Sequence, residues 1–160
     1  MDQTNLAPWS FNWVWGLPLI AITVIIHAFG LGYINERVAK VLIGDGKKRV
    51  PEKLSVMIMG GTALSATILH GFEAAIWASA FTLLEAVPDR GSAMLYSLSA
   101  MTTYGHTDIH LEKKWQLMGS LEALNGWILF GLTTAFLFTV IQKVWPHLNH
   151  SGNPDSSATS

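Results

Sequence analysis

Residues 92–108 read SAMLYSLSAMTTYGHTD, and no other part of the chain is as informative about its architecture. The first half carries apolar side chains at helical spacing and follows PDRG at residues 88–91, a sequence that ends a preceding helix. Ser92 is a suitable N-cap, so we predict a short helix over residues 92–103. The second half is polar and ends in aspartate. The wider stretch of residues 88–115 is too polar to span a membrane and too apolar for an ordinary surface loop.

The composition of the whole chain assigns it to the membrane. Of its 160 residues, 50% are apolar and only 13% are charged, whereas soluble domains carry about 25% charged residues. This balance excludes an ordinary soluble domain and an intrinsically disordered chain. The net charge of −1 gives no basic field for nucleic acid. Cysteine is absent, which excludes a disulfide framework, a thiolate zinc site and a cysteine nucleophile.

Three apolar runs are long enough to cross a membrane, because roughly 30 Å of hydrocarbon needs about 20 helical residues. We predict transmembrane helices over residues 17–34, 55–87 and 116–144. Tryptophans precede the first run, as is typical of a membrane interface. The chain is therefore predicted to be an all-α membrane protein, in which residues 88–115 join the second and third spans.

The distribution of positive charge predicts the orientation. The loop of residues 35–54 holds six of the ten lysine and arginine residues, whereas residues 1–16 hold none. Because basic loops stay on the cytoplasmic side of the cell membrane, we predict a cytoplasmic loop and an extracellular N-terminal segment. Residues 88–115 then lie outside, and the C-terminal tail, residues 145–160, lies in the cytoplasm. The tail is rich in Ser, Asn, Gly and Pro and is predicted to be disordered.

The position of residues 92–108 between two spans, on the outer side, predicts a re-entrant loop. A short apolar helix can bury itself among neighbouring helices, and the extended residues after it can turn their carbonyl groups inward. Non-helical backbone at membrane depth is tolerated only where it is buried in protein or lines a water-filled path. The loop is therefore predicted to line a pore.

The loop and its flanking spans resemble the pore of potassium channels. Residues 93–103 match, without gaps, the pore helix and Thr-Thr run of that family, and residues 104–108 stand where the family has Val-Gly-Tyr-Gly-Asp. Gly126 and Gly131 resemble the paired glycines of the pore-lining inner helix. The resemblance extends over residues 55–142, in particular to small bacterial potassium-channel-like proteins with an extra helix ahead of the two-helix pore.

This resemblance implies a tetrameric pore formed by residues 55–144, which comprise an outer helix (55–87), a pore helix (92–103), a selectivity filter (103–107) and an inner helix (116–144). It implies passive conduction of monovalent cations, potassium first, and no enzymatic activity. No cofactor is implied beyond potassium ions in the filter. The expected partners are further copies of the chain, membrane lipid and monovalent cations, and nucleic acid is not among them.

The residues that the resemblance assigns to the ion filter are Thr102, Thr103, Tyr104, Gly105, His106, Thr107 and Asp108. In the family, rings of backbone carbonyl groups replace the hydration shell of potassium, which implies potassium binding at Thr103, Tyr104 and Gly105. Thr107 stands where the family has its second glycine, and a β-branched residue at positive φ is an outlier. His106 brings a titratable group to the same outer half. Two alternatives therefore stay open: a non-selective or proton-conducting cation pore, and a non-conducting structural or regulatory membrane subunit.

Polar side chains near the filter are expected to support it. Ser99 occupies the pore-helix position from which several family members contact the closing aspartate, here Asp108. Ionisable residues inside a membrane are costly and mark functional positions. The residues expected to support the filter are Ser99, Glu73, Glu122 and Asn125.

Two histidines within the spans have several interpretations. His70 and Glu73 lie three residues apart and share a helix face, either as a structural pair between packed helices or as part of a proton relay. His27 is expected to be hydrogen-bonded at a helix interface. Alternatively, His27 and His70 hold a haem axially, which would make the chain a membrane cytochrome.

Small and hydroxylated residues of the third span also have two interpretations each. Gly126 and Gly131 are candidates for the hinge of a gate, and equally for points of close helix packing. Of the adjacent Thr133 and Thr134, only one can face a water-filled cavity well.

Overall fold

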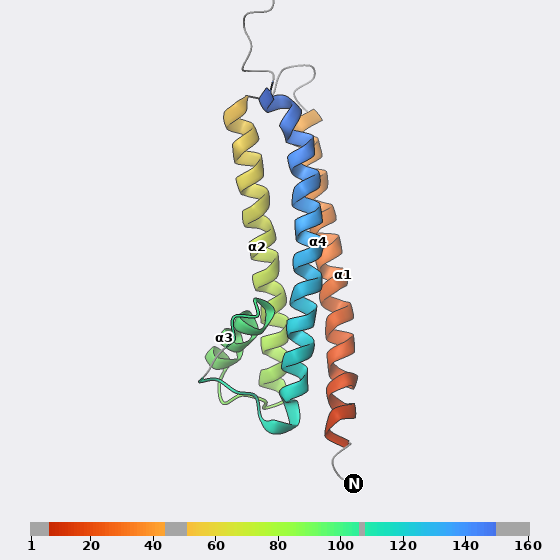
Figure 1. Cartoon of the computed structure of the whole chain (residues 1–160), viewed down its shortest axis with the longest axis vertical. Helices are drawn as coiled ribbons and strands as arrows, with labels where there is room; N and C mark the ends of the chain where they lie inside the picture. The colour runs from red at the N-terminus through yellow and green to blue at the C-terminus, as the bar shows by residue number, and fades with distance from the viewer. Residues whose placement is uncertain (1–6, 44–50, 106–107, 150–160) are drawn as a thin grey trace, which may run out of the picture.

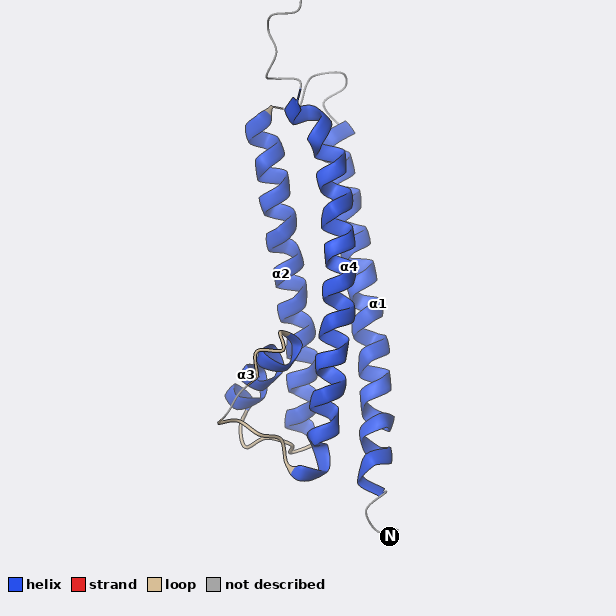
Figure 2. Cartoon of the chain, in the orientation of Figure 1, coloured by secondary structure: helices blue, strands red, loops and turns tan. Residues whose placement is uncertain are grey.

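The computed structural model describes residues 7–43, 51–105 and 108–149. Three long helices, α1 (Ala7–Ile43), α2 (Glu52–Leu83) and α4 (Gln116–Asn149), run side by side, and the short helix α3 (Arg90–Met101) lies near one end of the bundle (Figure 1). A one-turn 3₁₀ helix, η2 (Lys113–Trp115), leads into α4. The described residues form only helices and loops, as Figure 2 shows, so the predicted all-α class is confirmed.

Each of the three long helices contains a segment long and apolar enough to cross a membrane: Trp9–Leu42, Glu52–Leu83 and Lys113–Val144. The first helix is longer than the predicted span of residues 17–34, because it begins at Ala7 and ends at Ile43. Hydropathy marks only the part of a helix that suits hydrocarbon. The backbone hydrogen bonds of a helix are made within the segment itself, so α1 continues through both interfaces.

The C-terminal end of α2 is set by a left-handed turn. We predicted that this helix continues to Val87, but it ends at Leu83. Glu85 has a φ of 52°, and the N–H of Ala86 donates to the carbonyl of Phe81 at 2.9 Å. A hydrogen bond of this span across a left-handed residue is the Schellman ending of a helix. Because α2 ends at Leu83, the residues that follow are free to form the loop that leads into α3 at Arg90.

The core at this end of the bundle joins α2, α3 and α4. Trp77 and Phe81 of α2, Ala93 of α3 and Met118 of α4 are fully buried together. The ring of Tyr96 in α3 packs edge-on against Phe81, with 5.5 Å between ring centroids and an interplanar angle of 89°. These contacts fix α3 obliquely against the two longer helices.

Helix α1 is tied to α4 by polar side chains. The Asn12 Nδ2 group donates to the Lys114 carbonyl at 2.7 Å, and the Met118 N–H donates to Asn12 Oδ1 at 3.1 Å. Asn12 thus satisfies an N–H in the first turn of α4, which no residue of α4 itself can reach within the helix. One helix therefore caps another across more than a hundred residues of sequence.

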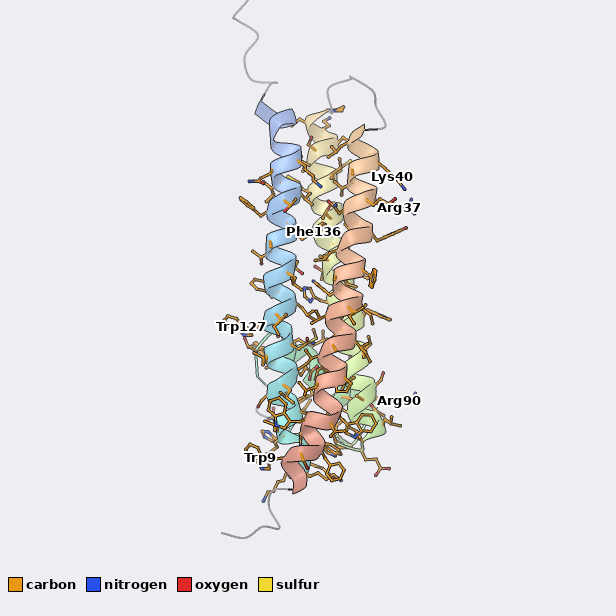
Figure 3. The ribbon with its side chains drawn as sticks, turned by 90° about the vertical axis from the view of Figure 1, so that its right-hand side faces the viewer. Trp9, Arg37, Lys40, Arg90, Trp127 and Phe136 are labelled. Carbon is orange, nitrogen blue, oxygen red and sulfur yellow. The ribbon has the colours of Figure 1, made fainter. Side chains whose placement is uncertain are left out.

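The two ends of the bundle differ in chemistry. Figure 3 shows Arg37 and Lys40 at one end, and Trp9 and Arg90 at the other. The N-terminal end of α1 and the short helix α3 lie at the same end (Figure 1). The loop between α2 and α4 is therefore on the side opposite to the basic C-terminal end of α1.

Candidate functional site

Asp89, rather than Ser92, caps the short helix α3. The helix begins at Arg90, two residues earlier than predicted, and ends at Met101. Asp89 Oδ1 accepts from the Ser92 N–H at 2.9 Å, and Asp89 Oδ2 accepts from the Ser92 hydroxyl at 2.6 Å. Aspartate is a favoured N-cap because its carboxylate satisfies an otherwise unbonded N–H. The predicted capping residue is thus a donor to the actual one.

This cap predicts a pH dependence of stability. Hydrogen bonds from the Ser92 hydroxyl and backbone N–H hold the pKa of Asp89 below its ordinary value. A carboxyl whose pKa is lower in the folded state stabilises the fold above its unfolded pKa of about 4, and this contribution is lost as pH falls through the folded value. We therefore expect acidification from about pH 5 to pH 3 to lower the thermal unfolding midpoint more in wild type than in Asp89→Asn. Asparagine still accepts the hydrogen bond but does not titrate, so equal falls would contradict this role.

After α3, the backbone changes handedness at alternate residues. Thr102 is still helical, with φ −87° and ψ −2°. Thr103 has a φ of 55° and Gly105 a φ of 72°, whereas Tyr104, which lies between them, does not have a positive φ. The Tyr104 N–H donates back to the Ser99 carbonyl at 3.0 Å. Because a β-branched residue rarely adopts positive φ, Thr103 is a strained position at the innermost turn of the loop.

The predicted filter residues lie on the surface of the single subunit. Those that the structure describes are all exposed, and the Tyr104 side chain is 81% exposed. They are Thr102, Thr103, Tyr104, Gly105 and Asp108. His106 and Thr107, on which the expected change in the outer filter rests, lie outside the described residues.

Ser99 contributes through its backbone. Its hydroxyl donates to the Leu95 carbonyl at 2.8 Å, within α3, while its carbonyl receives the N–H of Tyr104. Over the described ranges, no hydrogen bond joins Ser99 to Asp108. The expected contact between these two side chains is therefore not made within one subunit, and support of the filter by Asp108 stays a prediction.

Gly126 allows α4 to pack directly against the end of α3. A Cβ at this position would lie 2.3 Å from the Met101 carbonyl oxygen and 2.8 Å from the Met101 Cα. At Gly131 a Cβ would meet nothing within 4 Å. Gly126 is ten residues into α4, and at 1.5 Å per residue α3 ends about 15 Å along that helix. Gly126 is therefore a point of close packing between α4 and α3. Gly131 keeps both interpretations, and the re-entrance of α3 into the membrane stays a prediction.

Two buried polar residues of α4 face different neighbours. Glu122 is fully buried beside Ser97 of α3, and neither of its carboxylate oxygens has a hydrogen-bond partner within the described parts of the chain. The Asn125 Nδ2 group donates to Thr23 of α1 at 2.9 Å. Glu122 therefore lies against α3, and its support of the filter stays a prediction, whereas the Asn125 amide holds α1 in place.

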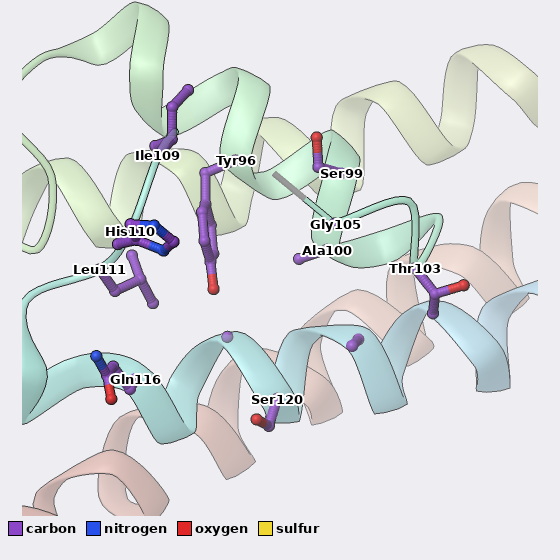
Figure 4. A pocket seen from close by; sticks show the side chains of 12 residues that line it. Tyr96, Ser99, Ala100, Thr103, Gly105, Ile109, His110, Leu111, Gln116 and Ser120 are labelled. Carbon is purple, nitrogen blue, oxygen red and sulfur yellow. The ribbon is translucent and has the colours of Figure 1, made fainter. Parts of the chain in front are cut away.

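A cavity of about 350 Å³ separates α3 and the loop that follows it from the first turns of α4 (Figure 4). Tyr96 points from α3 toward α4 in this view, and Gly105 lies beside Ser99 and Ala100. Ser99 of α3 and Gln116 and Ser120 of α4 are among the residues that line it, and the Ser99 hydroxyl points away from α4 in this view. The cavity therefore lies directly beside the loop that contains Thr103 and Gly105.

Deeper in the bundle, side chains from three helices form what we call the His–Glu cluster: His27 (α1), His70 and Glu73 (α2), and Thr133 (α4). His27 Nδ1 lies 2.8 Å from Glu73 Oε1. The other ring nitrogen of His27 lies 2.9 Å from Thr133 Oγ1, and His70 Nε2 lies 3.0 Å from the same oxygen. His27 and Glu73 are fully buried, whereas the His70 side chain is 28% exposed. The cluster is polar throughout although it lies inside the bundle.

The cluster settles several expectations. His70 and Glu73 do share a face, with Nδ1 and Oε2 3.5 Å apart, and His27 is hydrogen-bonded at a helix interface. Glu73, however, faces the two histidines instead of the filter, so its predicted supporting role is corrected. Thr133 is buried in the cluster, whereas Thr134 is exposed.

A haem between the two histidines is excluded by their distance. The imidazole rings of His27 and His70 have centroids 4.9 Å apart and are tilted by 44°. A macrocycle ligated on both faces would have to lie between the rings, and there is no room for it. The interpretation as a membrane cytochrome is therefore wrong.

Sequence reasoning missed Asn12, which caps α4 from α1. It singled out Thr133 only as a candidate to face a cavity, whereas Thr133 joins both histidines. A polar residue in an apolar run was the only signal for either contact, and such a residue does not indicate which side chain it contacts.

A short helix that lies against two long apolar helices at one end of the bundle, and is followed by a turn back through Thr103 and Gly105, is the arrangement expected of an ion-channel pore subunit. The family model described as "Ion channel" matches residues 56–143, which is more than half of the chain. The chain therefore belongs to this ion-channel family, and it is a multi-pass membrane protein with a potassium-channel-like pore domain and an extra N-terminal helix. No curated protein and no solved structure matched the chain.

Proposed function

We propose that the chain forms a homotetrameric pore through which monovalent cations, potassium first, flow passively down their gradient. The observation that carries this proposal is the backbone from Met101 to Gly105, where positive φ at Thr103 and Gly105 alternates with Tyr104. Alternating handedness turns successive carbonyl groups toward one side of the chain. In an ordinary strand, successive carbonyl groups point to opposite sides. Carbonyl groups gathered in this way can replace water around a cation.

The depth of α3 supports the same proposal. Its C-terminus stops about 15 Å along α4, where its Met101 meets Gly126. The C-terminal end of a helix carries a partial negative charge, which favours a cation in the low-dielectric middle of a membrane. Potassium in this proposal binds at Thr103, Tyr104 and Gly105, and the Thr103 hydroxyl adds an oxygen at the inner end.

Exposed apolar side chains support assembly with further copies and contact with lipid. Leu95 and Leu98 of α3 and Trp127 and Phe130 of α4 are 40–67% exposed in the single subunit. They lie on the two helices that flank the filter loop. In the proposed tetramer, neighbouring subunits cover part of this surface and lipid covers the rest.

The proposed orientation follows from the two ends of the bundle. Arg37 and Lys40 lie at the end opposite to α3 and Trp9 (Figure 3). Because basic segments stay on the cytoplasmic side, we infer that the filter loop and the N-terminus of α1 lie outside, and that the C-terminus is cytoplasmic.

Ion flux through the purified protein in liposomes tests this function. We expect potassium flux that exceeds sodium flux, and loss of both in Gly105→Ala, because alanine at a φ of 72° costs roughly 1–2 kcal/mol and moves the carbonyl groups on either side. Gly71→Ala is the matched control, since a Cβ there meets nothing within 4 Å. Equal flux of the two ions would instead favour the non-selective pore that Thr107 suggests. No flux from wild-type protein of tetrameric size would favour the non-conducting subunit.

A further inference from the structure

We propose that the His–Glu cluster is a binding site for one divalent transition-metal ion per chain, with zinc as the ion that it suits best. The ligands are Nδ1 of His27, Nδ1 of His70 and the Glu73 carboxylate. One ligand atom from each of these residues lies within 4.8 Å of the others. Two imidazoles and one carboxylate are a donor set that zinc accepts, with a fourth position left for water.

Hydrogen-bond accounting at Thr133 shows which nitrogens can be free to bind a metal. Its hydroxyl oxygen lies 2.9 Å and 3.0 Å from Nε2 of the two histidines. A hydroxyl has two acceptor lone pairs but only one hydrogen, so it can accept from both imidazoles and can donate to only one. When both Nε2–H groups donate to Thr133, both Nδ1 atoms carry lone pairs, and both face the Glu73 carboxylate.

The carboxylate oxygen nearest His70 lacks the hydrogen bond that would close the cluster without a metal. Glu73 Oε2 is buried and has no hydrogen-bond partner among the described residues. Its distance from His70 Nδ1 is 3.5 Å, which is too long for an N–H···O bond. A buried oxygen without a donor is costly. A cation that is larger than a proton and lies between these atoms would remove that cost.

The distances suit zinc. Zinc–ligand bonds of about 2.0–2.2 Å in a tetrahedron place two ligand atoms about 3.4 Å apart, close to the 3.5 Å between His70 Nδ1 and Glu73 Oε2. The 2.8 Å between His27 Nδ1 and Glu73 Oε1 would have to widen by about 0.6 Å to reach this separation. Metal-bound histidines usually donate their second N–H to an oxygen, and Thr133 supplies that oxygen to both. Magnesium and calcium are disfavoured because they prefer oxygen ligands.

A path to the site exists on the side of His70. A pocket of about 450 Å³ is lined by His70 and Thr67 of α2, by Met101 and Thr103 beside the filter loop, and by Trp127 of α4. An ion entering there would meet His70 first and the buried Glu73 and His27 next. Because the ligands come from α1 and α2 and their second bonds go to α4, a bound ion would join all three spanning helices at one level.

The test is zinc binding to the full-length purified protein, measured by equilibrium dialysis against Zn²⁺ alone. Asparagine replaces the four histidines outside the cluster, at positions 106, 110, 147 and 150, so that only the cluster offers imidazole ligands. We expect this background protein to keep one Zn²⁺ per chain. Binding is measured without reference to ion flow, so its outcome does not depend on whether the channel conducts.

Ligand variants in that background locate the ion. We expect stoichiometric binding to be lost in Glu73→Gln and in His70→Asn; the second variant alters the most exposed ligand and disturbs the fold least. Thr133→Val keeps all three ligands and should weaken binding by about 10- to 100-fold, as loss of a partner behind a metal ligand does. Co²⁺ in place of Zn²⁺ should give the visible absorption of a tetrahedral site. Helical circular dichroism and elution volume check each variant's fold. A background protein that binds no Zn²⁺, or folded variants that bind it as well as the background does, would overturn the proposal.

Discussion

Gly126→Ala is expected to reduce ion flow through the pore strongly. The new methyl group would lie 2.3 Å from the Met101 carbonyl oxygen and 2.8 Å from its Cα, and these are backbone atoms that cannot turn away as a flexible side chain could. Overpacking of this kind costs about 1–3 kcal/mol and shifts the backbone. Here the shifted residue is the last one of α3, directly before Thr102 and Thr103. We therefore expect potassium flux in liposomes to fall by roughly tenfold or more, since about 1.4 kcal/mol corresponds to a factor of ten.

The control for this variant lies on the same helix. Gly131→Ala makes the same chemical change where a Cβ meets nothing within 4 Å. It should leave the thermal unfolding midpoint near that of wild type. If Gly131→Ala keeps its stability but changes open time in single-channel records, the hinge interpretation of Gly131 is supported. Wild-type stability and flux in Gly126→Ala would show that α3 does not rest on this glycine.

His27→Leu is expected to be the most destabilising single substitution in the bundle. His27 is fully buried, and in the metal-free protein its Nδ1–H donates to Glu73 Oε1 at 2.8 Å. Removing it leaves a buried carboxylate whose remaining neighbour, His70 Nδ1, is 3.5 Å away. Breaking a buried ion pair by removing one partner costs about 3–5 kcal/mol. We expect a loss of that order in the free energy of unfolding, measured by denaturant titration in detergent micelles with a chelator present, so that no bound metal contributes.

A double variant separates loss of the pair from loss of packing. His27→Leu combined with Glu73→Leu removes both partners, so that no carboxylate is left without a donor. Replacing both members of a buried pair by apolar groups is often close to neutral. The double variant should therefore be more stable than His27→Leu alone. If the double variant instead loses as much unfolding free energy, relative to wild type, as the two single variants lose together, the two residues do not act as a pair.

The described helices have two different roles: those of the pore domain carry the proposed filter, and α1 stabilises α4. The pore domain of residues 56–143 carries the loop that we propose as the filter. Helix α1 lies outside that domain, but Asn12 holds the beginning of α4 and His27 holds its middle. The extra helix is therefore positioned to stabilise the inner helix of its own subunit. This placement explains why α1 carries buried polar side chains in an otherwise apolar span.

Much of the architecture could be predicted from local sequence. Apolar runs of sufficient length identify spans because hydrocarbon tolerates only helices that satisfy their own backbone. The polar half of residues 92–108, placed between two spans, predicts the re-entrant loop for the same reason. The ends of the helices were less predictable. Helix α2 ends at Leu83 because Glu85 is left-handed, and a glutamate does not predict a left-handed residue, as a glycine would.

The sequence by itself determined the class of protein, its three spans, the loop between the last two and the presence of buried ionisable residues, because each of these follows from the chemistry of a continuous segment. Only the tertiary structure decided which distant residues meet. It placed Thr133 between two histidines, turned Glu73 toward His27 and brought Gly126 against the end of α3. Such pairings depend on how whole helices rotate and pack against one another, and one rotation is chosen by the sum of many small contacts along each interface.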